Sequence, residues 1–383
     1  LVLTEVALAL ILLVGASAMV KGFRNLANRF PGYEAGGTLS FRVTLPEKKY
    51  AGARARADFY ERAVAQLAAM PGAHGAAAVE YLPSGWSWQT GSFRIEDAPP
   101  RPGEEFRAGM QTITPEFFKV LRIPLRSGRF LTDQDGAEAT PVVVISETMA
   151  RRYWENGNPI GHRIRIRAND PWRTIVGVAG DIRQNTFDNK FRSTVYTPMA
   201  QAPPQSAGFL VRTEYDPISL AGAAREAIQG VDRDQPVYDI RTLRQLNSDN
   251  ASGVEYSAHM MLAFGLIALV LAVAGIYAVM AYAVVQRTHE IGVRIALGAR
   301  RGQVLRMILG NSVKLAAGGL VIGVPIAFVL MRILASLLVG VVWLDLPVLA
   351  ALTGLLGLAA AAAGYLPARR AAQVDPIVAL RHE

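Results

Sequence analysis

Four long apolar runs limit what this chain can fold into more than any other feature of its sequence. A helix that crosses a lipid bilayer needs about 20 mostly apolar residues, and four segments are long enough: residues 1–20, 256–286, 305–331 and 346–368. The second segment contains no Asp, Glu, Lys or Arg. We therefore predict four transmembrane helices.

Composition agrees with a protein that is only partly embedded in lipid. The chain is 51% hydrophobic and 19% charged, which is too apolar for an ordinary soluble protein and too charged for a wholly buried one. Residues 21–255 are polar enough to form a large domain outside the lipid. Cysteine is absent, which excludes disulfides, thiolate metal ligands and cysteine nucleophiles.

Basic residues beside the spans predict the orientation in the membrane, because short cytoplasmic loops are enriched in Lys and Arg. The loop 286–304 and the tail 369–383 are rich in arginine, whereas the loop 332–345 contains only Arg332. We expect 286–304 and the tail in the cytoplasm, and 21–255 with 332–345 on the other side. We therefore attribute the net charge of +9 to basic residues that set the membrane topology rather than to nucleic-acid binding.

The first run lacks the basic segment that precedes the core of a signal peptide, so we interpret it as a retained span. The chain begins inside this run, which suggests a piece of a longer protein. Glu5 is a carboxylate within it. Glu5 either lies close to the cytoplasmic surface or has a function inside the membrane, since a buried carboxylate is costly. The first reading is the simpler one.

Two strand–helix–strand patterns stand near the two ends of the external domain. The first has strands at 38–45 and 76–82 around a helix at 54–70, which places Tyr60, Val64, Leu67 and Met70 on one stripe. The second has a strand at 208–213, a helix that begins at Asp216-Pro217 and runs to about Gly230, and a strand PVYDI. The pattern predicts a split α/β arrangement.

A segment with a different pattern separates these two units, with boundaries near 90 and 205. Residues 83–105 are rich in Pro, Gly, Ser and Trp and are predicted to form a long loop. A short helix is predicted to start at Thr114-Pro115-Glu116. The stretches VVVIS, HRIRIR and TIVGVAG are typical of strands, and SETMARRYW is typical of a helix. The predicted fold class is therefore four transmembrane helices with a large α+β extracytoplasmic domain of two subdomains, one split and one inserted and β-rich.

The sequence offers no recognisable catalytic motif. The phosphate-binding pattern G-x-x-x-x-G-K-[ST] is absent, and so are H-E-x-x-H and G-x-S-x-G. The five histidines are widely separated along the chain. We expect no enzymatic activity, no metal and no cofactor bound by this chain itself.

Small residues in the last two spans predict close helix packing. GxxxG-like spacing lets helix backbones approach closely, and it occurs at Gly319 with Gly323 and at Ala360 with Gly364. No span carries a row of ionisable residues, so the sequence gives little support for a conduction path.

Residues 287–297, RTHEIGVRIAL, can form a short helix between the second and third spans. Glu290 and Arg294 are four residues apart and can pair on its wet side, and Gly298 can end it. Chemistry alone leaves two readings. The helix can be a surface anchor that fixes topology, or a lever that presents a cytoplasmic face to a partner.

A family resemblance favours the lever. The stretch EIGVRIALGARRGQVLRMIL resembles the connector of the MacB/FtsX-type ABC transporter permeases, and YLPARRAAQVDPIVALRHE is similar to the end of that family's chains. The external domain resembles the MacB-type periplasmic core in ITPEFFKVLRIPLRSGRFLTDQD, in VVVISETMARRYW and in VGVAGDIR. An ATPase domain is missing, and the start inside a span resembles the second half of duplicated permeases that carry two four-span units in one chain.

The resemblance implies a bacterial inner-membrane permease subunit without a tunnel. A cytoplasmic ABC ATPase dimer would bind ATP and act on two four-helix permease units. These units would transmit its movement to the periplasmic domains, which would act on a substrate or an adaptor there. The implied ATPase-coupling residues are Glu290, Gly292, Arg294, Leu297, Gly298 and Ala299. The implied functional tail residues are Pro367, Arg369, Arg370, Asp375, Pro376 and Leu380. The alternative hypothesis is a membrane sensor whose external domain binds a ligand.

Overall fold

The chain divides into two compact units. One, here called the helical unit, comprises Leu1–Leu26 and Ser252–Glu383, and the other, called the α/β unit, comprises Ala27–Ala251. The computed structural model describes residues 2–27, 30–83, 85, 89–96, 98, 105–155, 157–167, 169–184, 190–286, 293, 301–337 and 346–371.

A split four-stranded sheet forms the first part of the α/β unit. Its strands are β1 (Thr38–Thr44), β2 (Ala73–Val79), β10 (Ser206–Thr213) and β11 (Tyr238–Thr242), in the order β11-β1-β10-β2 with every neighbouring pair antiparallel. Helix α2 (Ala53–Ala68) joins β1 to β2, and η1 (Pro217–Leu220) with α5 (Ala221–Val231) joins β10 to β11. Each strand–helix–strand unit therefore interleaves with the other, as the sequence predicts.

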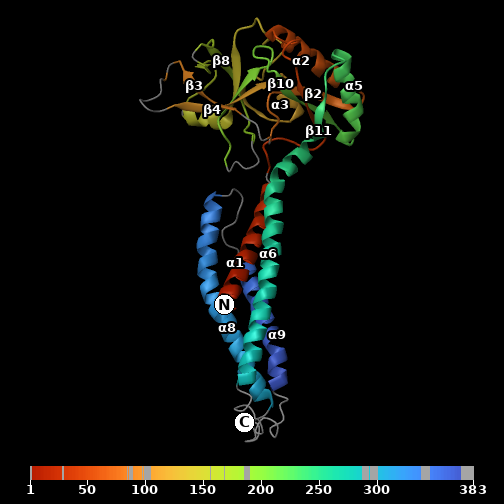
Figure 1. The fold of residues 1–383 in the computed structure, drawn as a ribbon. Coiled ribbons are helices and arrows are strands. Elements are labelled where there is room, and N and C mark those ends of the chain that lie inside the picture. The colour runs from red at the N-terminus through yellow and green to blue at the C-terminus, as the bar shows by residue number, and fades with distance from the viewer. Residues whose placement is uncertain are drawn as a thin grey trace. The chain divides into compact units, whose positions relative to one another are not determined.

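Helices α2 and α5 cover one face of this sheet (Figure 1). The predicted stripe on α2 is buried there, together with alternate residues of β1 such as Phe41 and Val43. Phe41 stacks on Phe209 of β10, with ring centroids 5.3 Å apart. The alternation of inward and outward side chains along β1 thus positions the helices.

Six strands of the inserted segment close into a ring, here called the barrel. They are β3 (Gln89–Ile95), β4 (Phe106–Ile113), β6 (Val142–Ser146), β7 (Arg163–Arg165), β8 (Arg173–Ala179) and β9 (Thr194–Pro198). Hydrogen-bonded pairing runs β3-β4-β9-β6-β8-β7 and returns to β3. Strand β5 (Leu125–Gly128) pairs with β8 outside the ring.

Strand β6 shows how the barrel is joined to the split sheet. Its Val143 and Ile145 belong to one core cluster, with Phe93 and Ile164, whereas Val142 and Val144 belong to another. That second cluster includes side chains of the split sheet and of helix α3 (Phe117–Val120). Strands β2 and β4 also pair directly, through the single residue pair Val79 and Ile113. Because β6 is buried on both faces, VVVIS reads as an unbroken apolar run.

Four long helices form the helical unit: α1 (Val2–Ala27), α6 (Leu243–Gln286), α8 (Arg301–Leu337) and α9 (Leu346–Ala371), the first part of α6 belonging to the α/β unit (Figure 1). Each contains a segment long and apolar enough to cross a membrane: Leu3–Gly22, His259–Gln286, Leu305–Ile333 and Leu346–Arg370. These segments correspond to the four predicted runs. Helix α4 (Glu147–Tyr153) lies in the α/β unit, where Ser146 caps it by accepting a hydrogen bond from the Met149 amide.

One sequence prediction is wrong in its details. The loop predicted at 83–105 contains strand β3. The strand has a weak sequence signal, because Phe93 and Ile95 are its only large apolar residues and the surrounding stretch is rich in Gly, Ser and Pro. The second span is confirmed at His259–Gln286, and the helix that carries it starts earlier in the chain, at Leu243. Its polar start has no hydropathy signal, but Thr242 and Gln245 exchange hydrogen bonds with each other's amides in a capping box.

An ion pair beside the barrel leads to a stability prediction. Arg129 donates to both carboxylate oxygens of Asp135 at 2.7 and 2.8 Å, and the Thr132 amide donates at 2.9 Å. The Arg129 hydrogen bonds lower the pKa of Asp135, burial of the carboxylate opposes them, and the Thr132 bond adds to the lowering. The Asp135 side chain is only 6% exposed. Ionised Asp135 therefore stabilises the folded state.

Asp135→Asn is expected to lower the free energy of unfolding by about 2 kcal/mol near pH 7, since hydrogen bonds to a charged group contribute about 1.5–3 kcal/mol. A lowered folded-state pKa gives stability that is present above the ordinary carboxyl pKa of about 4 and lost as pH falls through the folded value. The difference between wild type and variant should thus shrink in urea titrations as pH falls below the ordinary carboxyl pKa of about 4. Asp234→Asn, at a 91% exposed carboxylate, is the control. An equal loss for both variants would refute the prediction.

Candidate functional site in the transmembrane helices

Glycines on α8 bring its backbone against α1. A Cβ atom added at Gly319 would lie 2.7 Å from the Val6 Cβ and 3.0 Å from the Leu3 carbonyl oxygen. A Cβ at Gly323 would lie 3.0 Å from the Ala7 Cα. Carbon atoms in ordinary contact are about 3.5–4.0 Å apart. Only glycine therefore fits at these two positions without a shift of α1.

The second predicted small-residue pair lies where α9 meets the rest of the bundle. A Cβ at Gly364 would overlap the Ser312 hydroxyl of α8 and lie 2.8 Å from the Ser312 Cβ. Ala360, one turn earlier, is 1% exposed and shares a core cluster with Ala316 of α8 and Ile276 of α6. These two positions thus lie in contacts between α9 and its neighbours.

Helix α1 also contacts α6. A Cβ at Gly265 of α6 would lie 2.9 Å from a methyl carbon of Leu13. Ala9, Leu10 and Val14 of α1 belong to a cluster with Ala268 of α6. One helix, α1, therefore touches both α6 and α8 through glycine-lined contacts.

The tail residues are described only in part. Pro367 lies inside α9, and Arg369 and Arg370 are in its last turn, where basic side chains interact favourably with the helix dipole. The Arg370 Nη1 donates to the Tyr277 hydroxyl of α6 at 3.4 Å. The predicted residues Asp375, Pro376 and Leu380 lie outside the described residues. So do all six coupling residues: Glu290, Gly292, Arg294, Leu297, Gly298 and Ala299.

Charged groups are sparse within the described spans. Glu5 is the one carboxylate in the four candidate segments, and its Oε2 is buried without a hydrogen-bond partner. Lys314 of α8 is exposed. Among the described residues, no three His, Cys, Asp or Glu side chains gather as metal ligands would. The described spans thus bring together packing contacts rather than a chain of proton-carrying groups.

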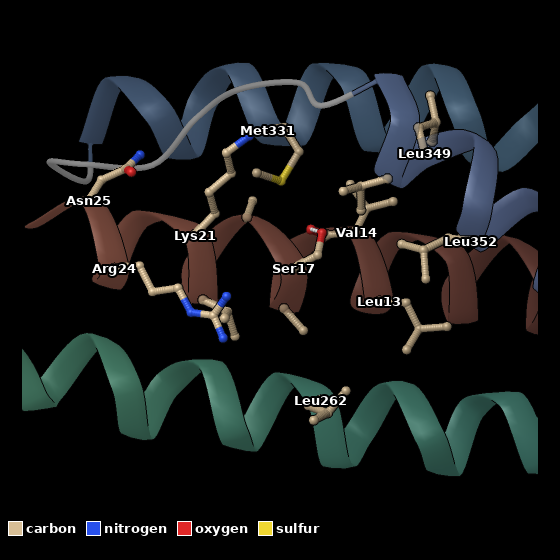
Figure 2. Close-up of a pocket in the computed structure, with 14 residues that line it drawn as sticks. Leu13, Val14, Ser17, Lys21, Arg24, Asn25, Leu262, Met331, Leu349 and Leu352 are labelled. Carbon is tan, nitrogen blue, oxygen red and sulfur yellow. Dashed lines mark hydrogen bonds between the residues drawn. The ribbon is translucent and has the colours of Figure 1, made fainter.

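A pocket of about 580 Å³ lies between α1, α6, α8 and α9 (Figure 2). Leu13, Val14 and Leu352 form apolar walls, and Leu262 and Met331 contribute from α6 and α8. Lys21, Arg24 and Asn25 follow in the last turns of α1 and line the other end. Such a pocket suits a molecule with a hydrocarbon part and a polar end.

Two known domain families together cover nearly the whole chain. The MacB-like periplasmic core domain matches residues 2–231, and the FtsX-like permease C-terminal domain matches residues 262–376. The chain belongs to the MacB/FtsX-like permease family. As a MacB/FtsX-like permease, it is a multi-pass inner-membrane protein, and its α/β unit is the periplasmic domain.

Several relatives of this MacB/FtsX-like permease are known. The pyoverdine export ATP-binding/permease protein PvdT of Pseudomonas aeruginosa is 28% identical over 277 residues, covering 69% of this chain and 41% of PvdT. The uncharacterized ABC transporter permease YknZ of Bacillus subtilis is 29% identical over 310 residues, covering 73% and 71%. The periplasmic region of MacB from Actinobacillus actinomycetemcomitans matches with TM-score 0.40 and 14% identity, over 59% of this chain and 97% of that one. The chain thus spans less than half of PvdT.

Sequence reasoning missed three features of the MacB/FtsX-like bundle. It did not find Gly265, which has no glycine four residues away to complete a GxxxG pattern. The Arg370–Tyr277 contact joins residues far apart in sequence and has no local signal. The pocket could not be predicted, because its lining residues come from four different helices. The basic residues Lys21 and Arg24, just beyond an apolar run, were the only available sign of its polar end.

Proposed function

We propose that this chain is the mechanotransmitting permease subunit of an ABC-type transporter. A separate cytoplasmic ATPase dimer binds ATP and moves, and the spans pass this movement to the periplasmic domain, which acts on a substrate or an adaptor in export or efflux. Two four-helix permease units work together, supplied by a second copy or by another half of a longer chain.

The observation that carries the proposal is the continuity of α6. This one helix has 44 residues, more than twice the roughly 20 that a span needs. Its Leu243 and Leu246 are buried in a core cluster of the α/β unit, and its Ile276 and Met280 are buried in a cluster of the helical unit. Because backbone hydrogen bonds run along a helix, displacement of one end is passed toward the other.

The packing of the helical unit supports the same mechanism. The glycine contacts pack the backbones of α1 and α8 closely, so the two helices move together when either is displaced. The sparse charge in the described spans does not favour an ion pathway through the bundle. A pore is not needed when the work is done on the periplasmic side.

The ATPase is proposed to dock on residues 286–304 and the tail. Glu290, Arg294, Leu297, Gly298 and Ala299 carry the family's connector pattern. The sequence lacks a phosphate-binding G-x-x-x-x-G-K-[ST] motif, so ATP is assigned to the partner. Relatives such as YknZ are permease components of ABC transporters, which supports a partner of this kind.

Arg294→Glu and Gly298→Leu are expected to reduce co-purification of the co-expressed ATPase by tenfold or more. The first reverses a charge at the proposed interface and the second adds a bulky side chain there, and a cost of about 1.4 kcal/mol is enough for a tenfold loss. Arg332→Glu makes the same charge change at the opposite end of the third span, near the end of α8. It should leave ATPase binding unchanged. Normal recovery of the ATPase with both connector variants, at wild-type expression and melting temperature, would rule out docking there.

A further inference from the structure

A cleft in the α/β unit is lined by more basic than acidic residues. It has a volume of about 1110 Å³ and is bordered by the barrel strands β3, β4, β7 and β8, by α2 and by residues 201–204. Its charged lining residues are Arg56, Arg94, Arg165, Arg167 and Arg173 against Glu80, Glu105 and Asp170. Counted over the described residues, the lining therefore carries an excess of two positive charges.

Arg173 is the most unusual of these side chains, because it is buried and no carboxylate among the described residues forms an ion pair with it. It is 7% exposed, its Nη1 donates to the Gln201 Oε1 at 2.8 Å, and its Nε has no hydrogen-bond partner. Burial lowers the pKa of the guanidinium, and the nearby charge of Asp170 opposes this. A buried charge that meets only a neutral amide is costly to the folded state.

Gln201 is held in place to meet Arg173. Its amide Nε2 lies 3.3–3.4 Å from the carbonyl oxygens of Asp135, Gly136 and Thr140, to which it donates. These bonds use the amide hydrogens and leave the Oε1 for Arg173. The arrangement therefore positions Arg173 without neutralising it.

Arg94 and Arg165 are a second place in the same cleft where positive charge is not balanced by a described carboxylate. They are direct cross-strand partners on β3 and β7, so their side chains leave the sheet on the same face. Like charges in that position repel. The Arg165 guanidinium stacks over the Trp172 ring at 4.7 Å, and its Nε is buried without a hydrogen-bond partner. Among the described residues, neither arginine forms an ion pair.

Three of the remaining charged residues of the cleft are already engaged. Glu80 accepts a hydrogen bond from the Thr112 hydroxyl at 3.0 Å, and Glu105 lies 3.9 Å from Arg107. Arg56 donates to backbone carbonyl oxygens, including that of Pro203 at 3.1 Å. Arg167 and Asp170 cancel in net charge, which leaves Arg94, Arg165 and Arg173 as the arginines available to a ligand.

We propose that this cleft binds an organic anion, whose carboxylate or phosphate is neutralised by Arg94, Arg165 and Arg173. Planar guanidinium groups with free N–H donors suit both of these acceptors. Phe106, Met110 and Pro203 line the same cleft and provide apolar contact for the rest of the molecule. The inference goes beyond the permease function, because it does not depend on ATPase docking.

The test uses the full chain in nanodiscs of zwitterionic lipid, titrated calorimetrically with phenyl phosphate, phenylacetate and benzyl alcohol. We expect at least one anion to bind and benzyl alcohol not to bind, and the anion that binds identifies the acceptor as phosphate or carboxylate. Binding should weaken as ionic strength rises from about 0.05 to 0.5 M. Arg173→Gln should weaken it at least about tenfold, because it removes a buried charged partner.

Arg165→Gln is a second variant with the same expectation, and Arg225→Gln is the matched control. Arg225 lies exposed on α5 and is not part of the cleft. Removal of the uncompensated charge leaves Arg173→Gln at least as stable as wild type, so folding should not limit the test. The proposal fails if neither anion binds, if benzyl alcohol binds equally well, or if Arg225→Gln weakens binding as much as the cleft variants.

Discussion

Gly319→Leu is expected to break the α1–α8 contact and leave a bundle that aggregates or unfolds on extraction in detergent. Even a single Cβ at this position would lie 2.7 Å from the Val6 Cβ, and leucine adds three further carbons. Overpacking of one or two methylenes already costs about 1–3 kcal/mol, and here the obstacle includes the Leu3 backbone, which cannot rotate away. We expect a loss of more than about 3 kcal/mol, seen as a lowered melting temperature and a broadened elution peak.

Gly354→Leu is the matched control for this prediction. Gly354 lies in α9, and a Cβ added there would meet nothing within 4 Å. The same substitution should therefore leave the melting temperature near that of wild type. Gly319→Ala should fall between the two, since it adds only the first carbon. Equal behaviour of Gly319→Leu and Gly354→Leu would show that the α1–α8 contact does not hold the bundle together.

The glycine positions illustrate what could be predicted of the site. The spacing of Gly319 and Gly323 indicates that some helix approaches closely, because a groove without side chains is a property of one helix alone. The spacing does not say which helix fills the groove. That partner, Val6 and Ala7 of α1, is more than 300 positions away in sequence and is set by the whole bundle. Local patterns therefore predict a surface but not the contact it makes.

The same distinction holds for the fold. The strands and helices of the split sheet were predictable, because the large apolar residues of β1 and α2 recur with periods of 2 and 3.6. Closure of the barrel was not, since it depends on pairings such as the parallel β4–β9 ladder, which joins residues 109–113 to residues 194–198. The burial of Arg173 could not be predicted either, because a charged residue at the start of a strand normally faces solvent.

Phe118→Ala is expected to destabilise the α/β unit by about 3–5 kcal/mol, the usual cost of removing a buried phenylalanine ring. Phe118 of α3 is fully buried, stacks on Phe130 at 4.5 Å and meets Tyr196 of β9 edge-on at 5.1 Å. It lies in the cluster shared by the barrel and the split sheet. Backbone pairing between β2 and β4 is a single residue pair, so side-chain packing must supply most of the attachment.

Urea unfolding followed by tryptophan fluorescence measures this effect, because four of the five tryptophans fall within residues 27–251. Tyr215→Ala removes an aromatic side chain that is 69% exposed and should change stability by no more than about 0.5 kcal/mol. Phe118→Leu keeps most of the buried volume and should lose less than Phe118→Ala. A Phe118→Ala loss as small as that of Tyr215→Ala would mean that the barrel and the split sheet are held together elsewhere. In that case, force delivered through α6 to Leu243 and Leu246 would not reach the barrel through this cluster.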